Sequence, residues 1–298
     1  MRFDKRARAW VETAVAATVV HSQQVDGGVA SVIDRVTVVD DEGRRRRLIL
    51  RRVPPRPGVT GHDPTAEITG ETTALRRLHP SRLTPVLLAA DPQGVHCGVP
   101  ASLQSVLPGH PVVAPKEAFG WARSLAGSVL ELADLGVGCD DLNPFVPWTT
   151  AEPRPPSWSS SPSSWELVIG ALDRRLPPAG PPQFVHRDFH PGNILFSDGN
   201  VSGIVDWVHA CRGPLEVDVS RCRVEIALLA GVAAADGFLE ACGSAVAAYH
   251  PLWDALVALE LAPCLDELLA FNAIGASLTI PGLQVTLDRI VQHAAAAC

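Results

Sequence analysis

Lysine is almost absent from this chain of 298 residues, in which Lys5 and Lys116 stand against 23 arginines. No lysine lies between those two positions, so a site in that stretch that needs a cation has to use an arginine. Positive charge is not in excess either, because the formal net charge is −7. A negative net charge gives no general attraction for polyanions. The four-arginine run 44–47 is expected to be a solvated strand end, so we expect no nucleic-acid partner.

Long apolar runs and paired cysteines are also missing. No run reaches the roughly 18 apolar residues that a membrane-spanning helix needs, so we expect no membrane segment. The basic residues near the N-terminus superficially resemble a signal peptide, but Glu12 interrupts the apolar segment and the spacing favours a packed helix. The seven cysteines are scattered and contain no C-x-x-C pair, which predicts buried thiols in a reducing cytosol and excludes a disulfide framework.

The composition is that of a folded globular protein. Hydrophobic residues make up 47% of the chain and charged residues 19%, which argues against general disorder. The length is sufficient for one large domain or two ordinary ones. Apolar runs predict strands at residues 86–90 and 95–99, and the Ala- and Leu-rich last third predicts helices over 219–233, 235–249, 251–272 and 283–297.

The polar cluster at residues 186–193 is the most informative stretch. It reads His186-Arg187-Asp188 and then, after four residues, Asn193, with short apolar runs on both sides. Asp198-Gly199 separates two β-prone runs and predicts a hairpin whose second strand ends at Asp206. With a two-residue turn, Asn193 would lie opposite Ile204 and diagonal to Asp206, about 7–8 Å away at Cβ.

The spacing H-R-D-x-x-x-x-N, followed by a hairpin and a carboxylate, is typical of kinase catalytic loops. In that chemistry Asp188 orients and deprotonates an acceptor hydroxyl, and Asn193 and Asp206 hold the Mg²⁺ that bridges the nucleotide phosphates. Asp206 is followed by Trp207-Val208, where protein kinases have Phe-Gly, and no Ala-Pro-Glu segment follows.

His190-Pro191-Gly192-Asn193, together with Ile204-Val205-Asp206-Trp207, resembles the aminoglycoside phosphotransferase family of small-molecule kinases. The resemblance implies an α+β, protein-kinase-like two-lobed fold, with a small antiparallel β-rich lobe (residues 1–108) that binds the nucleotide. A larger, mainly helical lobe (residues 109–298) would carry catalysis and acceptor binding. It also implies ATP or GTP and Mg²⁺ as cofactors, with ATP between the lobes, and an antibiotic of the aminoglycoside type as one acceptor.

Two residues are predicted to anchor the nucleotide phosphates. Kinases use a strand lysine, and because none is present here, Arg51 at the end of the apolar run 48–50 is our choice. A helix begins after Asp63, its N-cap, with Pro64 in the first turn. Glu71 falls within that helix's apolar stripe, where a carboxylate is costly without a partner, and Arg51 is the expected partner. A solvent-reaching Glu71 is the alternative.

Further contacts with the nucleotide are implied by the resemblance. The loop around Gly27-Gly28, with Ser31, would cover the phosphates, because backbone amides approach an anion closely where side chains are small. A plain hairpin turn at the two glycines is the alternative. Backbone groups of Ser105 and Leu107 would contact the adenine. Asp218 would open the next helix and brace the catalytic loop, and an ordinary helix cap is the alternative.

The acceptor and two other functional classes stay open. Residues 214–298 contain ten acidic residues and three arginines, so a cationic acceptor would be attracted there, and a solvated acidic face explains the same count. His186, Asp188 and His190 alternate and, on a strand, could bind the metal of a hydrolase. A nucleotide-binding pseudokinase is the second alternative.

Overall fold

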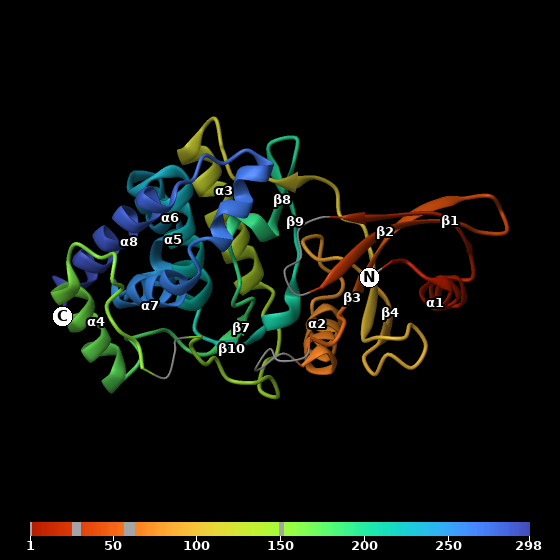
Figure 1. Cartoon of the computed structure of the whole chain (residues 1–298), viewed down its shortest axis with the longest axis horizontal. Coiled ribbons are helices and arrows are strands. Elements are labelled where there is room, and N and C mark those ends of the chain that lie inside the picture. The colour runs from red at the N-terminus through yellow and green to blue at the C-terminus, as the bar shows by residue number, and fades with distance from the viewer. Residues whose placement is uncertain (1, 26–30, 57–62, 149–151) are drawn as a thin grey trace. The chain divides into compact units, whose positions relative to one another are not determined.

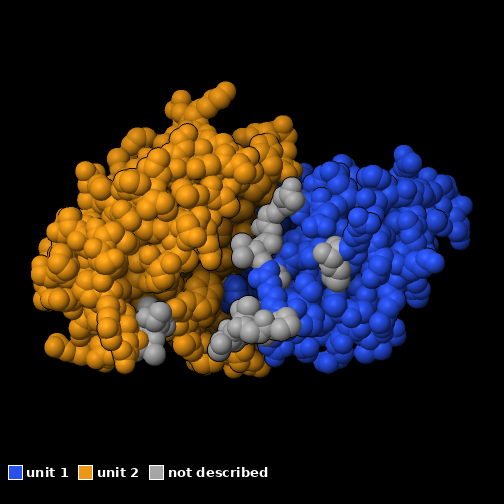
Figure 2. All heavy atoms as spheres, viewed as in Figure 1, with its two compact units in different colours: residues 1–108, 203–210 blue, residues 109–202, 211–298 orange. Residues whose placement is uncertain are grey.

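The chain forms a helix and an antiparallel sheet first and continues into a mainly helical region. In a computed structural model, which describes residues 2–25, 31–56, 63–148 and 152–298, it forms two compact units (Figure 2). Unit 1 comprises residues 1–108 and 203–210, and unit 2 comprises residues 109–202 and 211–298. The segment 203–210, which carries Asp206, is therefore part of unit 1 although in sequence it follows the predicted catalytic loop, residues 186–193. The assignment of nucleotide binding to residues 1–108 and of catalysis and acceptor binding to residues 109–298 stays a prediction.

Unit 1 is built on a five-stranded antiparallel sheet (Figure 1). Its strand order is β1-β2-β3-β5-β4, with β1 at Thr18–Val25, β2 at Val32–Val39, β3 at Arg45–Arg52, β4 at Leu87–Asp91 and β5 at Ala101–Ser105. Alternating residues of the central strands, such as Val36 and Val38 or Leu48 and Leu50, are buried in one core. Arginines 45–47 are exposed, as expected of a solvated strand end.

Two helices accompany this sheet. Helix α1 (Lys5–Val15) packs Ala7 and Val11 into the same core, which confirms a packed N-terminal helix. Helix α2 (Pro64–Arg77) begins where the sequence predicts, since the Asp63 side chain accepts hydrogen bonds from the backbone amides of Thr65 and Ala66.

One predicted strand of unit 1 is wrong. The apolar run at residues 95–99 forms turns, and the strand that follows β4 is β5. The reason is Asp91, whose carboxylate accepts hydrogen bonds from the backbone N–H groups of Val95, His96 and Cys97. A side chain that captures three successive amides competes with strand pairing and folds the segment back on itself.

Unit 2 is mainly helical. Its α-helices are α3 (Ala118–Asp134), α4 (Pro162–Arg174), α5 (Glu216–Ala230), α6 (Val232–Cys242), α7 (Leu252–Leu261) and α8 (Ile280–Ala295). A 3₁₀ turn, η3 (Gly243–Val246), follows α6. The predicted helix over 251–272 is interrupted, because α7 ends at Leu261 and is followed by the 3₁₀ turns η4 (Ala262–Cys264) and η5 (Glu267–Ile274). Pro263 has no N–H group to continue the α-helical ladder, which explains the break after α7.

Short strands frame the catalytic loop. Strands β7 (Gln183–Val185) and β10 (Cys211–Gly213) pair antiparallel, and β6 (His110–Pro111), β8 (Ile194–Ser197) and β9 (Asn200–Ile204) form a second small sheet. The hairpin of β8 and β9 is confirmed: Asp198 has φ 52° and Gly199 φ 80°. Positive φ at both central residues is the signature of a type I′ turn.

All seven cysteines are free thiols, and five of them are buried, as the sequence predicted. Among the described residues, no helix combines the length and the apolar character that crossing a bilayer requires.

Candidate active site

Arg51 and Glu71 form a buried ion pair in unit 1. The Nη1 atom of Arg51 lies 3.3 Å from Oε1 of Glu71, and the two residues are 5% and 1% exposed. The predicted ion pair is therefore confirmed. The alternative, in which the Glu71 side chain reaches solvent, is wrong. Burial lowers the pKa of Arg51, but Asp206 and Glu71 outweigh that effect and raise it, so the guanidinium stays charged.

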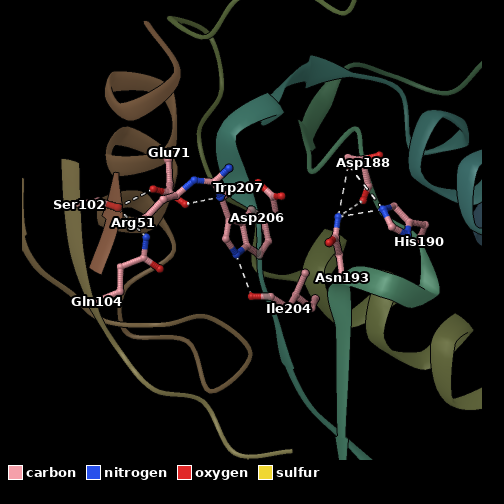
Figure 3. A network of polar contacts seen from close by, with 10 residues as sticks. All are labelled: Arg51, Glu71, Ser102, Gln104, Asp188, His190, Asn193, Ile204, Asp206 and Trp207. Carbon is pink, nitrogen blue, oxygen red and sulfur yellow. Dashed lines mark hydrogen bonds and ion pairs between the residues drawn. The ribbon is translucent and has the colours of Figure 1, made fainter. Parts of the chain in front are cut away.

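The pair is extended by two polar residues of β5 (Figure 3). Ser102, which pairs with Arg51 across β3 and β5, donates to Oε2 of Glu71 at 2.7 Å, and Gln104 donates to the Ser102 hydroxyl at 2.9 Å. Sequence analysis missed both residues. The signal was present, because Ser102 and Gln104 alternate with apolar residues and so share one face of a strand.

Asp206 belongs to the same cluster. Its Oδ1 atom accepts a hydrogen bond from Nη1 of Arg51 at 2.7 Å, and its side chain is 37% exposed. Asp206 has φ 68°, a conformation that non-glycine residues rarely adopt and that is often found at functional sites. A 3₁₀ turn, η2 (Trp207–His209), follows, and the buried indole of Trp207 donates to the carbonyl of Ile204 at 2.9 Å.

The catalytic loop of unit 2 leaves β7 at His186 and is fixed by Asp218 of α5. The Asp218 carboxylate accepts the backbone N–H of His186 at 2.8 Å and that of Arg187 at 2.6 Å. The bracing contact implied by the family resemblance is therefore present. Burial raises the pKa of Asp218 to about 7. The two backbone hydrogen bonds favour the ionised form and lower the pKa, but burial outweighs them.

Arg187 holds the turn before Asp188. It has φ 71°, and its guanidinium lies 3.9 Å from the ring centre of Trp148 and 5.1 Å from that of Phe145. Such cation–π contacts stabilise a buried guanidinium, and here they fix the residue that precedes the predicted catalytic carboxylate.

Asp188 is partly buried, with 20% of its side chain exposed, and has three polar neighbours. Asn193 donates to its carbonyl at 3.0 Å and to Oδ2 at 3.3 Å (Figure 3), Nη2 of Arg221 lies 3.3 Å from Oδ1, and Nε2 of His190 lies 3.5 Å from Oδ2. Burial alone would raise the pKa of Asp188, but His190 and Arg221 hold it well below its usual range.

Two of these neighbours were missed as site residues. Arg221 stands three residues after Asp218, so the two share one face of α5, a spacing that could have indicated the contact. His190 was considered only as a metal ligand. Burial lowers its pKa, but the Glu225 and Asp188 carboxylates outweigh this and raise it to about 10.

Asn193 does not lie on a strand. It ends the 3₁₀ turn η1 (Pro191–Asn193), in which its N–H is bonded to the carbonyl of His190, and β8 begins one residue later. Asp206 lies two residues after β9. The cross-strand register used in the sequence analysis therefore does not extend to either residue.

The oxygen atoms needed for a magnesium ion are available in each unit. Asn193 uses its amide nitrogen within unit 2, and the described residues offer its Oδ1 atom no donor. Asp206 uses only Oδ1, and the described residues likewise leave its Oδ2 atom without a donor. Amide and carboxylate oxygens are the ligands that Mg²⁺ prefers, so the chemistry of both residues fits the predicted role.

The other predicted nucleotide contacts lie in the segment before β2 and at the end of β5. Gly27 and Gly28 lie outside the described residues, and Ser31 is buried. The N–H of Ser105 is bonded to the carbonyl of Val86, so only its carbonyl is left as a candidate for a base. The side chain of Leu107 packs against Gly203, where a Cβ atom would come within 2.4 Å of it.

The metal-hydrolase alternative finds no support in the described part of the chain, which contains no group of three or more His, Cys, Asp or Glu side chains arranged to hold a metal ion. In the triplet on which it rests, His190 is turned to Asp188 and Asn193, and Asp188 is shared with Arg221.

Half of the acidic residues after residue 213 are internal. Five of its ten carboxylates are buried, each with polar partners inside unit 2: Glu216, Asp218, Glu225, Asp254 and Asp288. The charge count therefore does not by itself indicate a cationic acceptor.

Known proteins share this combination of features. The model of the phosphotransferase enzyme family matches residues 28–258. The chain is 34% identical over 150 residues to a homoserine kinase of Gluconacetobacter diazotrophicus and 30% identical over 130 residues to a homoserine kinase of Neisseria meningitidis. These matches cover 46% and 42% of this chain and only 46% and 43% of the relatives, less than half of each.

The fold is similar to that of a thermostable mutant of the aminoglycoside phosphotransferase APH(4)-Ia, solved as a ternary complex with AMP-PNP and hygromycin B. The TM-score is 0.61 at 16% identity, over 97% of this chain and 98% of the other. The predicted α+β, protein-kinase-like fold is confirmed by this likeness.

This fold, with an H-R-D-x-x-x-x-N loop braced by Asp218, is of the protein-kinase-like class. Because the family model matches more than half of the residues, the chain belongs to the phosphotransferase enzyme family, as the sequence motifs suggested.

Proposed function

We propose that this protein is a Mg²⁺-dependent kinase that transfers the γ-phosphoryl group of ATP or GTP to a hydroxyl group of a small molecule. The observation that carries the proposal is Asp188, a partly exposed carboxylate with a lowered pKa, on a loop that Asp218 and Asn193 hold in place. A carboxylate in this position orients the attacking hydroxyl in kinase chemistry.

In this proposal Arg51 binds the phosphates of the nucleotide. Its Nη1 atom serves Glu71 and Asp206, while Nη2 has no partner among the described residues and can donate to a phosphate oxygen. Glu71, held by Ser102, keeps the guanidinium in place, and Gly27, Gly28 and Ser31 cover the phosphates. Ser105 and Leu107 contact the base through backbone groups.

Asp188 accepts a hydrogen bond from the acceptor hydroxyl and aims its oxygen at the γ-phosphorus. A bond forms between that oxygen and phosphorus, the bond from phosphorus to the β–γ bridging oxygen breaks, and the hydroxyl proton passes to Asp188. Because the pKa of Asp188 is low, the proton moves late, when the attacking oxygen has become acidic. A loose transition state needs mainly positioning of this kind.

Asn193 and Asp206 would hold Mg²⁺, which when bound supplies positive charge to the phosphate oxygens. Within unit 1, Arg51 keeps Oδ1 of Asp206 occupied, so that Oδ2 is the oxygen left for the metal.

Two classes of acceptor are supported by the comparisons. The homoserine kinases that this chain resembles favour a small amino acid with a primary hydroxyl group, and the fold relative in complex with hygromycin B favours an aminoglycoside antibiotic and hence a resistance role. The identities of 34% and 30% favour testing L-homoserine first.

The test is ADP or GDP release from the purified full chain, with ATP or GTP, Mg²⁺ and a panel of L-homoserine, choline, hygromycin B and a macrolide. We expect at least one acceptor to stimulate release. Asp188→Asn should then lower turnover by about 10²- to 10⁴-fold with nucleotide binding retained. The control is Asp198→Asn, an exposed carboxylate at the β8–β9 turn.

Unchanged turnover in Asp188→Asn would refute the assignment of this residue. If nucleotide binds and no acceptor in the panel stimulates its consumption, the pseudokinase alternative is favoured instead.

A further inference from the structure

Glu225 on α5 is a deeply buried carboxylate next to the catalytic loop. It is 1% exposed, with Oε1 2.9 Å from Nη2 of Arg221 and Oε2 3.1 Å from Nδ1 of His190. A carboxylate at such depth is costly unless cations compensate it. Arg221 is one helical turn away on α5, and His190 comes from the segment that links the catalytic loop to η1.

Both partners of Glu225 also contact Asp188. A single nitrogen of Arg221, Nη2, lies 2.9 Å from Glu225 and 3.3 Å from Oδ1 of Asp188. The two ring nitrogens of His190 are divided in the same way, with Nδ1 toward Glu225 and Nε2 toward Oδ2 of Asp188. Asp188, Arg221, Glu225 and His190 thus form a closed ring, called here the Asp188 ring, in which every carboxylate lies between two nitrogen-bearing side chains.

This arrangement constrains each side chain through its neighbours. Arg221 has the length and freedom to move away from Asp188 or to close fully onto it, and Glu225 opposes both movements by attracting the same nitrogen. Closing onto Asp188 would occupy lone pairs that an acceptor hydroxyl needs, and moving away would leave Oδ1 of Asp188 without the cation that orients it.

We propose that Glu225, acting through Arg221, is a positioning residue that sets the orientation of the Asp188 carboxylate for phosphoryl transfer. The inference rests on the proposed function, because it assigns Asp188 the role of orienting the acceptor hydroxyl. Glu225 is too deeply buried to reach a substrate and acts only through its neighbours.

The test compares Glu225→Gln with Glu216→Gln, a matched control. Glu216 is on the same helix, is 2% exposed and bonds to the amide of Gly180, away from the Asp188 ring. With ATP, Mg²⁺ and the panel acceptor that gives the highest turnover, we expect Glu225→Gln to lower kcat by about 10- to 100-fold, the loss typical of a misplaced catalytic group. Glu216→Gln should change kcat by no more than about 2-fold, which is well below the loss expected for Glu225→Gln.

Binding of the nucleotide separates positioning from damage to the fold. The number of sites and the Kd, measured by calorimetry with a non-hydrolysable ATP analogue, should match the wild type in Glu225→Gln, so that kcat per binding site is what falls. Glu225→Asp, which keeps the charge, should recover part of the lost kcat.

A second variant keeps the test decisive if Glu225→Gln does not fold. Arg221→Met should lower kcat to a similar extent, and in the Asp188→Asn background it should cause no further loss of residual turnover. The inference is overturned if either variant keeps wild-type kcat, or if kcat falls only in proportion to the fraction of nucleotide-binding protein. A wild-type protein without transfer activity would overturn the proposed function itself, a distinguishable result.

Discussion

Arg51 and Asp206 are 155 residues apart in the sequence and are joined in unit 1 by a 2.7 Å hydrogen bond. Asp206 thus shares the Nη1 atom of Arg51 with Glu71. One guanidinium therefore serves two carboxylates, which links the proposed phosphate-binding cation to a proposed metal ligand through a charge-assisted hydrogen bond.

Two replacements of Arg51 test whether its positive charge binds the nucleotide phosphates. Arg51→Met should weaken binding of ATP by about 10- to 100-fold, because a charged hydrogen bond to phosphate contributes about 1.5–3 kcal/mol. Arg51→Lys should keep most of the affinity, since a lysine ammonium group binds the phosphates in kinases. Calorimetric titration with an ATP analogue measures both, and equal affinity in Arg51→Met and the wild type would show that another group binds the phosphates.

Removing the brace of the catalytic loop should affect both stability and turnover. Asp218→Asn replaces one acceptor oxygen by an N–H donor that faces a backbone N–H, at a cost of about 1–3 kcal/mol. Arg187, whose N–H binds Asp218, has a positive φ that the loop must hold in place. We therefore expect kcat to fall when the hydrogen bond is lost. Urea unfolding and steady-state kinetics measure the two effects, with the exposed Glu240→Gln as control. Wild-type kcat in Asp218→Asn would mean that the loop does not need this brace.

Gly109 is expected to be intolerant of any side chain. It has φ 96°, and a Cβ atom would lie 2.3 Å from the carbonyl oxygen of Phe196. Gly109→Ala should therefore cost at least about 1–3 kcal/mol of the free energy of unfolding. Gly120→Ala on α3 is the matched control, because a Cβ there meets nothing within 4 Å, and alanine should stabilise that helix by roughly 0.5–1 kcal/mol.

Asp288 provides a test of pH dependence away from the active site. Its carboxylate on α8 accepts hydrogen bonds from Trp165 and from Ser159 and Ser160. Burial raises the pKa of Asp288, but these hydrogen bonds outweigh it and lower the pKa below its usual range. A lowered folded-state pKa stabilises the protein above the unfolded value, near pH 4, and that contribution is lost as the pH falls further.

Asp288→Asn should accordingly cost about 1–3 kcal/mol at pH 7, and its difference from the wild type should shrink below about pH 4. Urea unfolding at pH 7 and at several acidic values measures the difference. A difference that does not change with pH would show that the ionised form is not the one that is stabilised.

The parts of the fold that could be predicted are those with local signals. Asp63 before Pro64 marks the start of α2, and Asp198-Gly199 marks the β8–β9 turn, because each side chain or backbone preference acts within a few residues. The Arg51–Glu71 pair followed from a simple requirement, since the chain has no lysine in that region and a buried carboxylate needs a cation.

The parts that could not be predicted depend on partners distant in sequence or on competition. The alternation around Ser102 and the spacing of Asp218 and Arg221 indicate shared faces of a strand and a helix. The partners that these faces meet are set by the pairing of β3 with β5 and by the packing of α5, which no short window reveals. The turns at 95–99 replaced an expected strand because the Asp91 side chain binds three amides, and α7 ended early because of Pro263.

The proposed use of Arg51 to bind phosphate, where kinases have a strand lysine, has a chemical consequence. Reagents that acylate primary amines can reach only the α-amino group, Lys5 and Lys116, and both lysines are exposed. The guanidinium of Arg51 does not react with them and would keep its charge. Complete amine acylation, which disables an enzyme that relies on a lysine, should therefore leave nucleotide binding by this protein intact.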